Sequence, residues 1–213
     1  MVGRFCSLEA IDVDRHATEL FEANLQAIDD RNWTYLFYGP FDTLAAYRAF
    51  LSSMATLDDP LFHAVIDRAG GKAAGVAAYM RIDAPNGVIE VGHINYSPQL
   101  QRKPAGTEAM YLMMRRAFDE LGYRRYEWKC DSLNEPSRRA AERYGFTFEG
   151  IFRQATVYKG RSRDTAWYSL LDSEWPTCKA AFEQWLAPEN FDSEGRQRRS
   201  LQAIRSEIIS AER

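Results

Sequence analysis

Cysteine is scarce in this sequence, which has only three among its 213 residues. Cys6, Cys130 and Cys178 lie far apart, and their odd number does not build a disulfide framework. Scattered cysteines of this kind are typical of reduced thiols in an intracellular protein. The sequence therefore excludes a disulfide-stapled secreted domain and predicts a cytoplasmic location.

Histidine and long apolar segments are scarce as well. None of the three histidines, His16, His63 and His93, has metal-ligand spacing with a cysteine, so no bound metal is expected. No apolar run approaches the ~18 residues of a membrane span. Residues 1–6 lack the apolar stretch of a signal peptide. We therefore expect no membrane partner.

The charge balance also lacks an excess of basic residues. Lysine and arginine number 27 against 30 aspartates and glutamates, a net charge of −3. A nucleic-acid partner is not expected, because such proteins normally carry a basic face. Hydrophobic residues reach 46%, which is ample for a core. The length fits one domain over residues 1–213, with 189–213 as a helical or flexible C-terminal tail.

Periodicity and turn residues predict an α/β chain with a mixed sheet. The expected strands are 61–67, 73–81, 88–96, 124–131, 147–155 and 164–171. The expected helices are 15–30, a segment after Asp42 or Thr43, a helix from Thr107 ending before Gly122, a short helix from about Pro136 to Gly145, and 174–186. The strand–helix–strand connection from 88 to 131 should make two strands parallel.

Two of these helices carry inward-facing candidates at helical spacing. In the first helix they are Leu20, Phe21 and Ile28. In the helix from Thr107 they form one stripe of Met110, Met113, Met114, Ala117, Phe118 and Leu121.

The segment after strand 88–96 is a candidate phosphate site. It reads Q-R-K-P-A-G from Gln101 to Gly106 and opens the helix at Thr107. Backbone N–H groups at such a helix start attract phosphate oxygens. The segment is neither a Walker A loop nor G-x-G-x-x-G. Taken alone, it fits an ordinary strand-to-helix connection equally well.

A second segment makes the first more specific. Asn134 ends a strand, Ser137 follows three residues later, and Gly145-Phe146 follows at eleven and twelve. This pattern resembles the N-x-x-[SA]…G-F motif of the GNAT superfamily of N-acetyltransferases, and the first segment then resembles that family's [QR]-x-x-G-x-[GA] loop. The resemblance covers residues 61–171. Ala-Gly-Thr-Glu-Ala with Asn-x-x-Ser resembles the Rim-type branch of ribosomal-protein N-terminal acetyltransferases.

The resemblance implies a GNAT fold, with strands 88–96 and 124–131 (the family's fourth and fifth) splayed around acetyl-CoA. Residues 102–107 would hold the pyrophosphate and the amides of Ile94 and Tyr96 the pantetheine arm. The full set of implied cofactor contacts is Ile94, Tyr96, Gln101, Arg102, Lys103, Ala105, Gly106, Thr107, Asn134 and Ser137. The implied function is N-acetyl transfer from acetyl-CoA to a primary amine, either a protein N-terminus or a small molecule, by direct attack in a ternary complex.

The reaction requires a deprotonated amine. From reference pKa values, about 14% of an α-amine but about 0.04% of a lysine side chain is free base at pH 7. Glu90 is the leading candidate for the general base, because it lies eleven residues before Gln101, the spacing of the catalytic glutamate in histone-acetylating relatives. The alternative is a structural glutamate paired with a neighbour. The other carboxylates near the same sheet are Glu127, Asp131 and Glu149.

Two positions depart from the family pattern. Ala141 stands where many relatives carry a tyrosine acid. Ser137 is the substitute that the Rim-type branch suggests, with Tyr144 as a second, although a thiolate leaves readily without an acid. Pro104 replaces the first glycine of the loop and removes one backbone donor.

The departures keep other functions open. Ala141 favours a non-catalytic acyl-CoA-binding regulatory protein with the same fold, and the loop alone would also suit a nucleotide-binding module. The amine acceptor is not identified by the sequence, and a homodimer is compatible with this branch.

Several further residues have two interpretations each. His93 is either a base or a packed strand residue. The aromatic residues of the 33–41 segment either line an acceptor pocket or cover a sheet edge. The arginine pair at 138–139 either reaches the 3′-phosphate of coenzyme A or forms surface ion pairs. These residues are Trp33, Tyr35, Phe37, Tyr38, Phe41, Arg138 and Arg139, to which we add Arg196, Arg198 and Arg199 as an expected solvated helix face.

Overall fold

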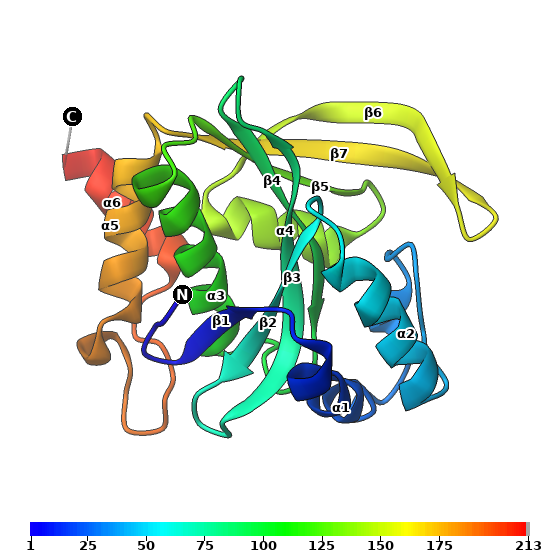
Figure 1. Ribbon diagram of the computed structural model, residues 1–213. Coiled ribbons are helices and arrows are strands. Elements are labelled where there is room, and N and C mark those ends of the chain that lie inside the picture. The colour runs from blue at the N-terminus through cyan, green and yellow to red at the C-terminus, as the bar shows by residue number, and fades with distance from the viewer. Residues whose placement is uncertain (212–213) are drawn as a thin grey trace.

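The computed structural model describes residues 1–211 and contains one mixed sheet in the order β1-β2-β3-β4-β5-β7-β6 (Figure 1). The strands are β1 (Cys6–Ala10), β2 (Leu61–Asp67), β3 (Lys72–Asp83), β4 (Val88–Tyr96), β5 (Arg125–Asp131), β6 (Thr147–Tyr158) and β7 (Arg161–Leu171). The β4–β5 pair is parallel and the other neighbouring strands are antiparallel. The predicted mixed sheet and its parallel pair are confirmed.

Helices cover both faces of this sheet. They are α1 (Val13–Asn24), η1 (Arg31–Trp33), α2 (Leu44–Ala55), α3 (Pro104–Arg115), η2 (Arg116–Glu120), α4 (Glu135–Tyr144), α5 (Trp175–Leu186), η3 (Pro188–Asn190) and α6 (Leu201–Ala211). The sheet separates two apolar clusters. Neighbouring residues of β3 belong to different clusters, because successive side chains of a strand point to opposite faces. Val76 and Ala78 pack with α1 and α2, whereas Ala77 and Tyr79 pack with α3. Figure 1 shows these two helical layers on either side of the strands.

Strand β1 was not predicted from the sequence. Its Cys6 and Leu8 are buried and alternate with outward residues, but the strand is only five residues long. A distant residue holds it in place: the buried carboxylate of Glu108 in α3 accepts hydrogen bonds from the backbone N–H groups of Arg4, Phe5 and Cys6 at 2.8, 2.6 and 2.8 Å. The N-terminal segment is thereby fixed to the first half of the helix whose start opens the candidate phosphate site.

The first helix is shorter than predicted. It ends at Asn24 instead of near residue 30, and Ile28, expected to face inward, is 99% exposed. Leu20 is buried as predicted. The side chain of Asp29 accepts a hydrogen bond from the backbone N–H of Arg31 at 3.1 Å, and such local bonds compete with the helical pattern. Residues 25–43 consequently form a long connection beside the sheet.

Helix α3 starts earlier than predicted, at Pro104 rather than Thr107. Proline suits the first helical position, because the N–H of that position has no partner within the helix in any case. The stripe from Met110 to Phe118 is buried as expected, but Leu121 is 50% exposed because the chain continues as the π-helical turn η2.

The predicted C-terminal tail contains helical segments. Residues 188–190 form η3, and α6 packs against α5 with Leu201 and Ile204 buried. Residues 212–213 of the predicted tail lie outside the described residues. None of the helices within residues 1–211 is long and apolar enough to cross a membrane.

Candidate active site

Strands β4 and β5 run side by side for four residues and then separate. The parallel pairing joins Val88 through Val91 to Arg125 through Trp128, although β4 continues to Tyr96 and β5 to Asp131. A bulge lies in β4 at this point: its register on β3 shifts, and His93 has a φ of 51°. The facing edges of the two strands beyond Val91 and Trp128 are therefore not paired with each other.

A large groove opens at the split. Its volume is about 1940 Å³, beyond the ~300–1,000 Å³ of pockets for one drug-sized ligand. Its walls come from β4, β5, β7, α3, α4, the 26–37 connection and the 191–197 segment. The groove has room for a long cofactor and a second substrate together.

The structure brings the predicted site residues together. Of the residues named from the sequence, the groove is lined by Glu90, Ile94, Tyr96, Gln101, Arg102, Lys103, Gly106, Thr107, Asn134 and Ser137. Ala105 is buried behind the groove surface. Segments that are distant in the sequence thus converge on one surface, as the two motifs predicted.

The N-terminus of α3 has no side-chain cap and remains the candidate phosphate site. Pro104 occupies its first turn. The following amides lack intrahelical partners and point out of the positive end of the helix dipole. A Cβ at Gly106 would lie 2.8 Å from the carbonyl oxygen of Leu100 and 3.3 Å from the ring of Tyr96. Glycine at this position therefore allows the helix start to pack closely against the preceding turn.

Gln101 holds this turn against the end of β4. Its Nε2 donates to the backbone oxygen of Tyr96 at 2.7 Å and to Oδ1 of Asn32 at 2.9 Å. The predicted loop residue thus joins β4, the 26–37 connection and the start of α3. Its side-chain contacts fix the shape of the turn before the candidate phosphate site.

Arg143 of α4 is a groove residue that the sequence reasoning missed. Its Nη1 donates to Oγ1 of Thr107 at 3.0 Å, and its guanidinium carbon lies 5.1 Å from the ring centroid of Trp185. Within residues 1–211 it forms no ion pair with a carboxylate. Ser137, Ala140 and Arg143 follow one another at helical spacing and all line the groove. That spacing was the available signal.

Asn134 and Ser137 are connected at the start of α4. The Oδ1 of Asn134 caps the helix by accepting from the backbone N–H of Ser137 at 3.2 Å. The Oγ of Ser137 accepts from Nε1 of Trp128 at 3.0 Å. Because this hydroxyl accepts from the indole, its own proton is directed elsewhere. Ala141 is fully buried behind it, and burial raises the pKa of Tyr144.

Glu90 lies in a buried ion-pair network. It is 2% exposed, and its carboxylate accepts from Nη1 of Arg81 at 2.7 and 2.8 Å and from Nζ of Lys129 at 2.8 Å. Each of its oxygens therefore already accepts a hydrogen bond from a cation. These contacts are those of the alternative interpretation, a structural glutamate paired with neighbours; whether Glu90 acts as the base stays a prediction.

Two other candidate carboxylates belong to the same network. Glu127 accepts from Lys129 at 2.5 Å and from Arg125 at 2.6 Å. Burial alone would raise the pKa of Glu127, but these two cations lower it overall. Hydrogen bonds from Arg125 lower the pKa of Glu149 to about 2. Neither carboxylate is therefore a strong proton acceptor.

His93 lies beside the split as a packed residue. Its ring stacks on Tyr38 with the centroids 5.6 Å apart, and its Nδ1 lies 3.3 Å from the Tyr38 hydroxyl. Burial, followed by the positive charge of Arg81, lowers the pKa of His93 to about 4. The imidazole is therefore neutral at pH 7.

The aromatic residues of the 33–41 segment divide between the groove and the core, and whether the groove residues bind the acceptor stays a prediction. Tyr35 and Phe37 line the groove. Trp33, Tyr38 and Phe41 pack against one another near α2. One half of the segment is therefore groove wall and the other half core.

The tip of the β6–β7 hairpin contacts the 33–39 segment, part of which lines the groove. The Nζ of Lys159 donates to the backbone oxygens of Trp33, Tyr38 and Gly39 at 2.7, 3.2 and 2.9 Å. Nη2 of Arg161 donates to the oxygen of Thr34 at 2.6 Å. The hairpin, which projects beyond the rest of the sheet in Figure 1, is thus tied to the 33–39 segment.

The basic residues expected outside the site form local pairs. Arg138 donates to Oη of Tyr168 at 3.1 Å, and Arg139 pairs with Glu135 at 3.1 Å on the surface. Among the arginines of the tail, Arg196 lines the groove while pairing with Asp192 and Glu194, and Arg199 pairs with Glu207. Arg139 therefore forms the surface ion pair that one interpretation predicted. The arginines of the tail are not all on a solvated face, because Arg196 lines the groove.

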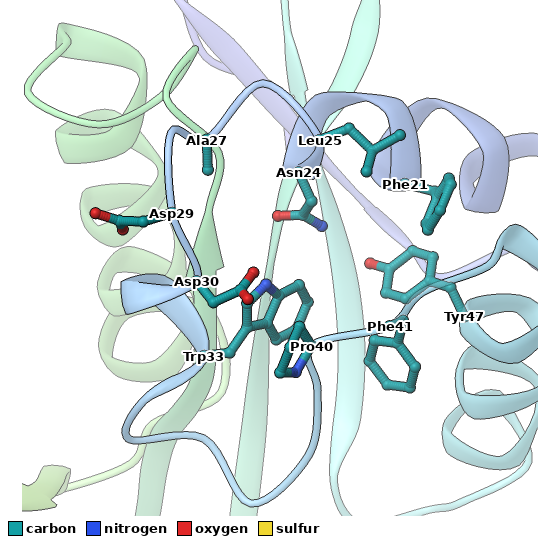
Figure 2. A pocket seen from close by; sticks show the side chains of 10 residues that line it. All are labelled: Phe21, Asn24, Leu25, Ala27, Asp29, Asp30, Trp33, Pro40, Phe41 and Tyr47. Carbon is teal, nitrogen blue, oxygen red and sulfur yellow. The ribbon is translucent and has the colours of Figure 1, made fainter.

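A second cavity, beside α1, is much smaller. Figure 2 shows its walls, which include Asn24 and the rings of Trp33, Phe41 and Tyr47. Its volume is about 110 Å³, too small for the ligands that usual binding pockets of ~300 Å³ or more enclose. The part of the chain that the structure describes contains no group of three or more His, Cys, Asp or Glu side chains that could hold a metal ion.

Comparisons with known proteins agree with this geometry. Residues 8–147 match the family model described as "Acetyltransferase (GNAT) domain". The crystal structure of a GCN5-related N-acetyltransferase from Brucella melitensis is 55% identical, with a TM-score of 0.94, and the match covers 96% of this chain and 93% of that one.

Two curated relatives match over shorter stretches. "Putative ribosomal N-acetyltransferase YdaF" of Bacillus subtilis (strain 168) is 31% identical over 105 residues, 49% of this chain and 57% of the relative. "Uncharacterized N-acetyltransferase p20" of Bacillus licheniformis is 28% identical over 111 residues, 52% of this chain and 62% of the relative. The chain thus spans less than two thirds of the length of either curated relative.

Proposed function

This chain belongs to the GNAT acetyltransferase family, and on that premise we propose that it moves an acetyl group from acetyl-CoA to a primary amine. The observation that carries the proposal is the split between β4 and β5 after Val91 and Trp128, which opens into a groove beginning at the uncapped start of α3. The uncapped helix start can bind a pyrophosphate. The unpaired strand edge can bind an extended arm through its backbone groups.

The residues present fit acetyl-CoA along this path. The amides from Ala105 to Thr107, together with Arg143, would hold the pyrophosphate. The free edge of β4 at Ile94 and Tyr96 would hold the pantetheine arm, with Asn134 and Ser137 on the opposite wall. Bound there, acetyl-CoA would supply an acetyl group activated as a thioester.

We propose that Ser137 donates its hydroxyl proton toward the departing sulfur. The hydroxyl accepts a hydrogen bond from the indole N–H of Trp128, so its own proton can be donated either to Sγ of Cys130, which lies beside it, or to a sulfur in the groove. The demand on this donor is modest, because a thiol of pKa ~8.5 leaves readily as a thiolate. The absence of a tyrosine at Ala141 is then compatible with catalysis.

We propose that the amine loses its proton to water in the open groove, while Glu90 holds Lys129 and Arg81 in place. An α-amine needs little assistance, since about 14% is already free base at pH 7, whereas a lysine side chain would have to overcome about 3.5 kcal/mol more. The ion pairs around Glu90 therefore favour an acceptor with an α-amine. This agrees with the Rim-type branch that the sequence suggested.

Direct attack in a ternary complex is supported by the state of Cys130. It is the cysteine that lines the groove, and burial raises the pKa of its thiol. A protonated thiol is a poor nucleophile, so an acetyl-cysteine intermediate is not favoured. Initial rates measured against both substrates should give intersecting lines, whereas parallel lines would indicate a covalent intermediate.

The deciding experiment is an acceptor screen with purified protein and acetyl-CoA. Release of the coenzyme A thiol is followed over a panel of amines and N-terminal peptides, and products are identified by mass spectrometry. We expect an N-acetylated product. Tight coenzyme A binding without turnover on any amine would instead support a non-catalytic acyl-CoA-binding protein.

We further propose that residues 1–213 act as one catalytic domain in the cytoplasm. The three cysteines are free and buried, which suits a reducing compartment. A homodimer is also proposed, and sedimentation of the purified chain would test it.

A further inference from the structure

One buried arginine in the groove has no counter-ion. Arg163 of β7 is 9% exposed and lines the groove. Within residues 1–211 its guanidinium forms no ion pair, and its one hydrogen bond to a side chain runs from Nε to Oγ1 of Thr165 at 3.1 Å. Burying a charge without a partner is costly, so such an arginine is expected to meet an anion.

The neighbouring carboxylates do not supply this anion. Asp131, whose strand pairs with β7 opposite Thr165, accepts from Oη of Tyr158 at 2.8 Å and from the backbone N–H of Leu133 at 2.9 Å. Glu90 is bound to the other two cations of this part of the groove, as described above. The guanidinium of Arg163 therefore has its two terminal nitrogens uncommitted.

Aromatic rings hold the arginine in position. Its guanidinium carbon lies 5.5 Å from the ring centroid of Phe37 and 5.9 Å from that of Tyr158. These contacts orient a planar group whose fork matches a carboxylate. The arginine is thus preorganised before any ligand arrives.

A second donor on the same strand is also unpartnered. Nε1 of Trp167 is buried without a hydrogen-bond partner among the described residues, and Trp167 lines the groove. Trp167 and Arg163 point to the same face of β7, because they are an even number of residues apart. This face of β7 therefore carries two donor groups that have no acceptor among the described residues.

We propose that the amine acceptor carries a carboxylate, which binds to Arg163 during the reaction. The inference rests on the proposed acetyltransferase function and narrows its substrate to amines with an anionic group, such as a short peptide. A polyamine would leave Arg163 unpaired and add a like charge beside it. The carboxylate could come from a peptide C-terminus or from an acidic side chain.

The test uses matched acceptors that differ in one group. One pair is a dipeptide as the free acid and as its C-terminal amide, and a second pair is Ser-Asp-amide and Ser-Asn-amide. Coenzyme A release is measured at saturating acetyl-CoA. We expect the carboxylate member of at least one pair to have a kcat/KM about 10- to 100-fold higher, the range for a charge-assisted hydrogen-bonded pair.

Substitution of the arginine should remove the preference. In Arg163→Met the kcat/KM of the carboxylate acceptor divided by that of its neutral partner should fall to about one. Arg163→Lys keeps the charge but loses the two-pronged geometry of the guanidinium, so it should retain part of this preference. Arg153→Met, at an exposed position of β6 outside the groove, serves as the control and should keep the full ratio. Thermal unfolding confirms that each variant is folded.

A binding measurement gives a readout without turnover. The N-acetylated acid and amide products are titrated into the protein with coenzyme A present, and the acid should bind more tightly only while Arg163 is intact. Equal turnover and equal binding of both members of both pairs would overturn the inference and leave the acetyltransferase function standing. Turnover of no amine at all would contradict the function itself.

Discussion

Val91 of β4 and Trp128 of β5 form the last residue pair before the two parallel strands part. The same Trp128 donates its indole N–H to Ser137 at the start of α4. One residue therefore marks the apex of the split and also fixes the hydroxyl that faces it. The groove, the proposed cofactor path and the proposed proton donor all depend on this geometry.

The close packing at the start of α3 gives a first prediction. Gly106→Ala would place a methyl group 2.8 Å from the oxygen of Leu100 and would push the helix start away from the turn. We expect half-maximal thermal stabilisation by acetyl-CoA to need at least about tenfold more ligand, because the amides no longer converge.

Gly70→Ala is the matched control for that substitution. An added Cβ at Gly70 would meet only Oδ2 of Asp67, at 3.7 Å, and the φ of Gly70 is not positive. The control should respond to acetyl-CoA as the unsubstituted protein does. An unchanged response of Gly106→Ala would remove the start of α3 from the cofactor site.

The network around Glu90 gives a second prediction. Glu90→Gln leaves Arg81 and Lys129 with a weaker acceptor, so we expect thermal stability to fall by about 1–3 kcal/mol and kcat by less than tenfold. Glu149→Gln, at the half-exposed end of the same network, should have a smaller effect on both. A loss of about 10²–10⁴ in kcat from a folded Glu90→Gln variant would instead identify Glu90 as the general base.

Ser137 gives a third prediction. Ser137→Ala removes the hydroxyl that Trp128 orients, and kcat should fall about tenfold. The effect stays modest because a thiolate is already a good leaving group. Steady-state rates at saturating substrates measure it, with Ser162→Ala on the exposed side of β7 as the control. A rate equal to that of the control would mean that the hydroxyl has no part in the reaction.

The hairpin tip gives a fourth prediction. In Lys159→Asn the backbone can keep its positive φ of 48°, which asparagine tolerates. The asparagine side chain is too short to reach the three backbone oxygens that the lysine contacts. The acceptor wall should loosen, and the acceptor KM should rise about 3- to 10-fold while acetyl-CoA affinity is preserved. Lys72→Asn, at an exposed position of β3, controls for the loss of charge. Equal KM values for the two variants would show that the tip does not shape the acceptor site.

His93 gives a fifth prediction, on the pH dependence of stability. Its folded pKa of about 4 lies below its ordinary value of 6.5 because burial disfavours the charged ring. The unfolded chain therefore binds the proton more readily, and stability present above pH 6.5 is lost as the pH falls toward 4, by up to about 1.4 kcal/mol per pH unit.

Asparagine at this position removes the titration while accepting the φ of 51°. Denaturant unfolding between pH 4 and 7.5 should therefore show a shallower loss of stability for His93→Asn than for the unsubstituted protein. Parallel curves for the two proteins would mean that the imidazole titrates at its ordinary pKa in the fold.

The sequence predicted the family and the splayed mixed sheet, and both are confirmed. The reason is that the informative signals were local. The stripe along α3 and the spacing from Asn134 to Gly145 each depend on neighbouring residues. These two local patterns are found in the fold, whereas the helical pattern predicted for residues 15–30 ends at Asn24.

What could not be predicted depends on contacts between distant residues. Glu108 fixes the N-terminal segment across about one hundred residues of sequence. No local pattern therefore predicted strand β1. The partners of Glu90 lie on β3 and β5 and follow from strand register rather than from spacing. Arg163 is exceptional because of what it lacks, and a missing partner leaves no mark in a sequence.

We propose that coenzyme A enters between β4 and β5 with its diphosphate at the start of α3. Isothermal titration of the purified chain with acetyl-CoA can decide this. We expect saturable binding of one molecule per chain, weakened by Gly106→Ala and unaffected by Gly70→Ala. No detectable heat at millimolar acetyl-CoA, with a folded protein in the cell, would contradict it.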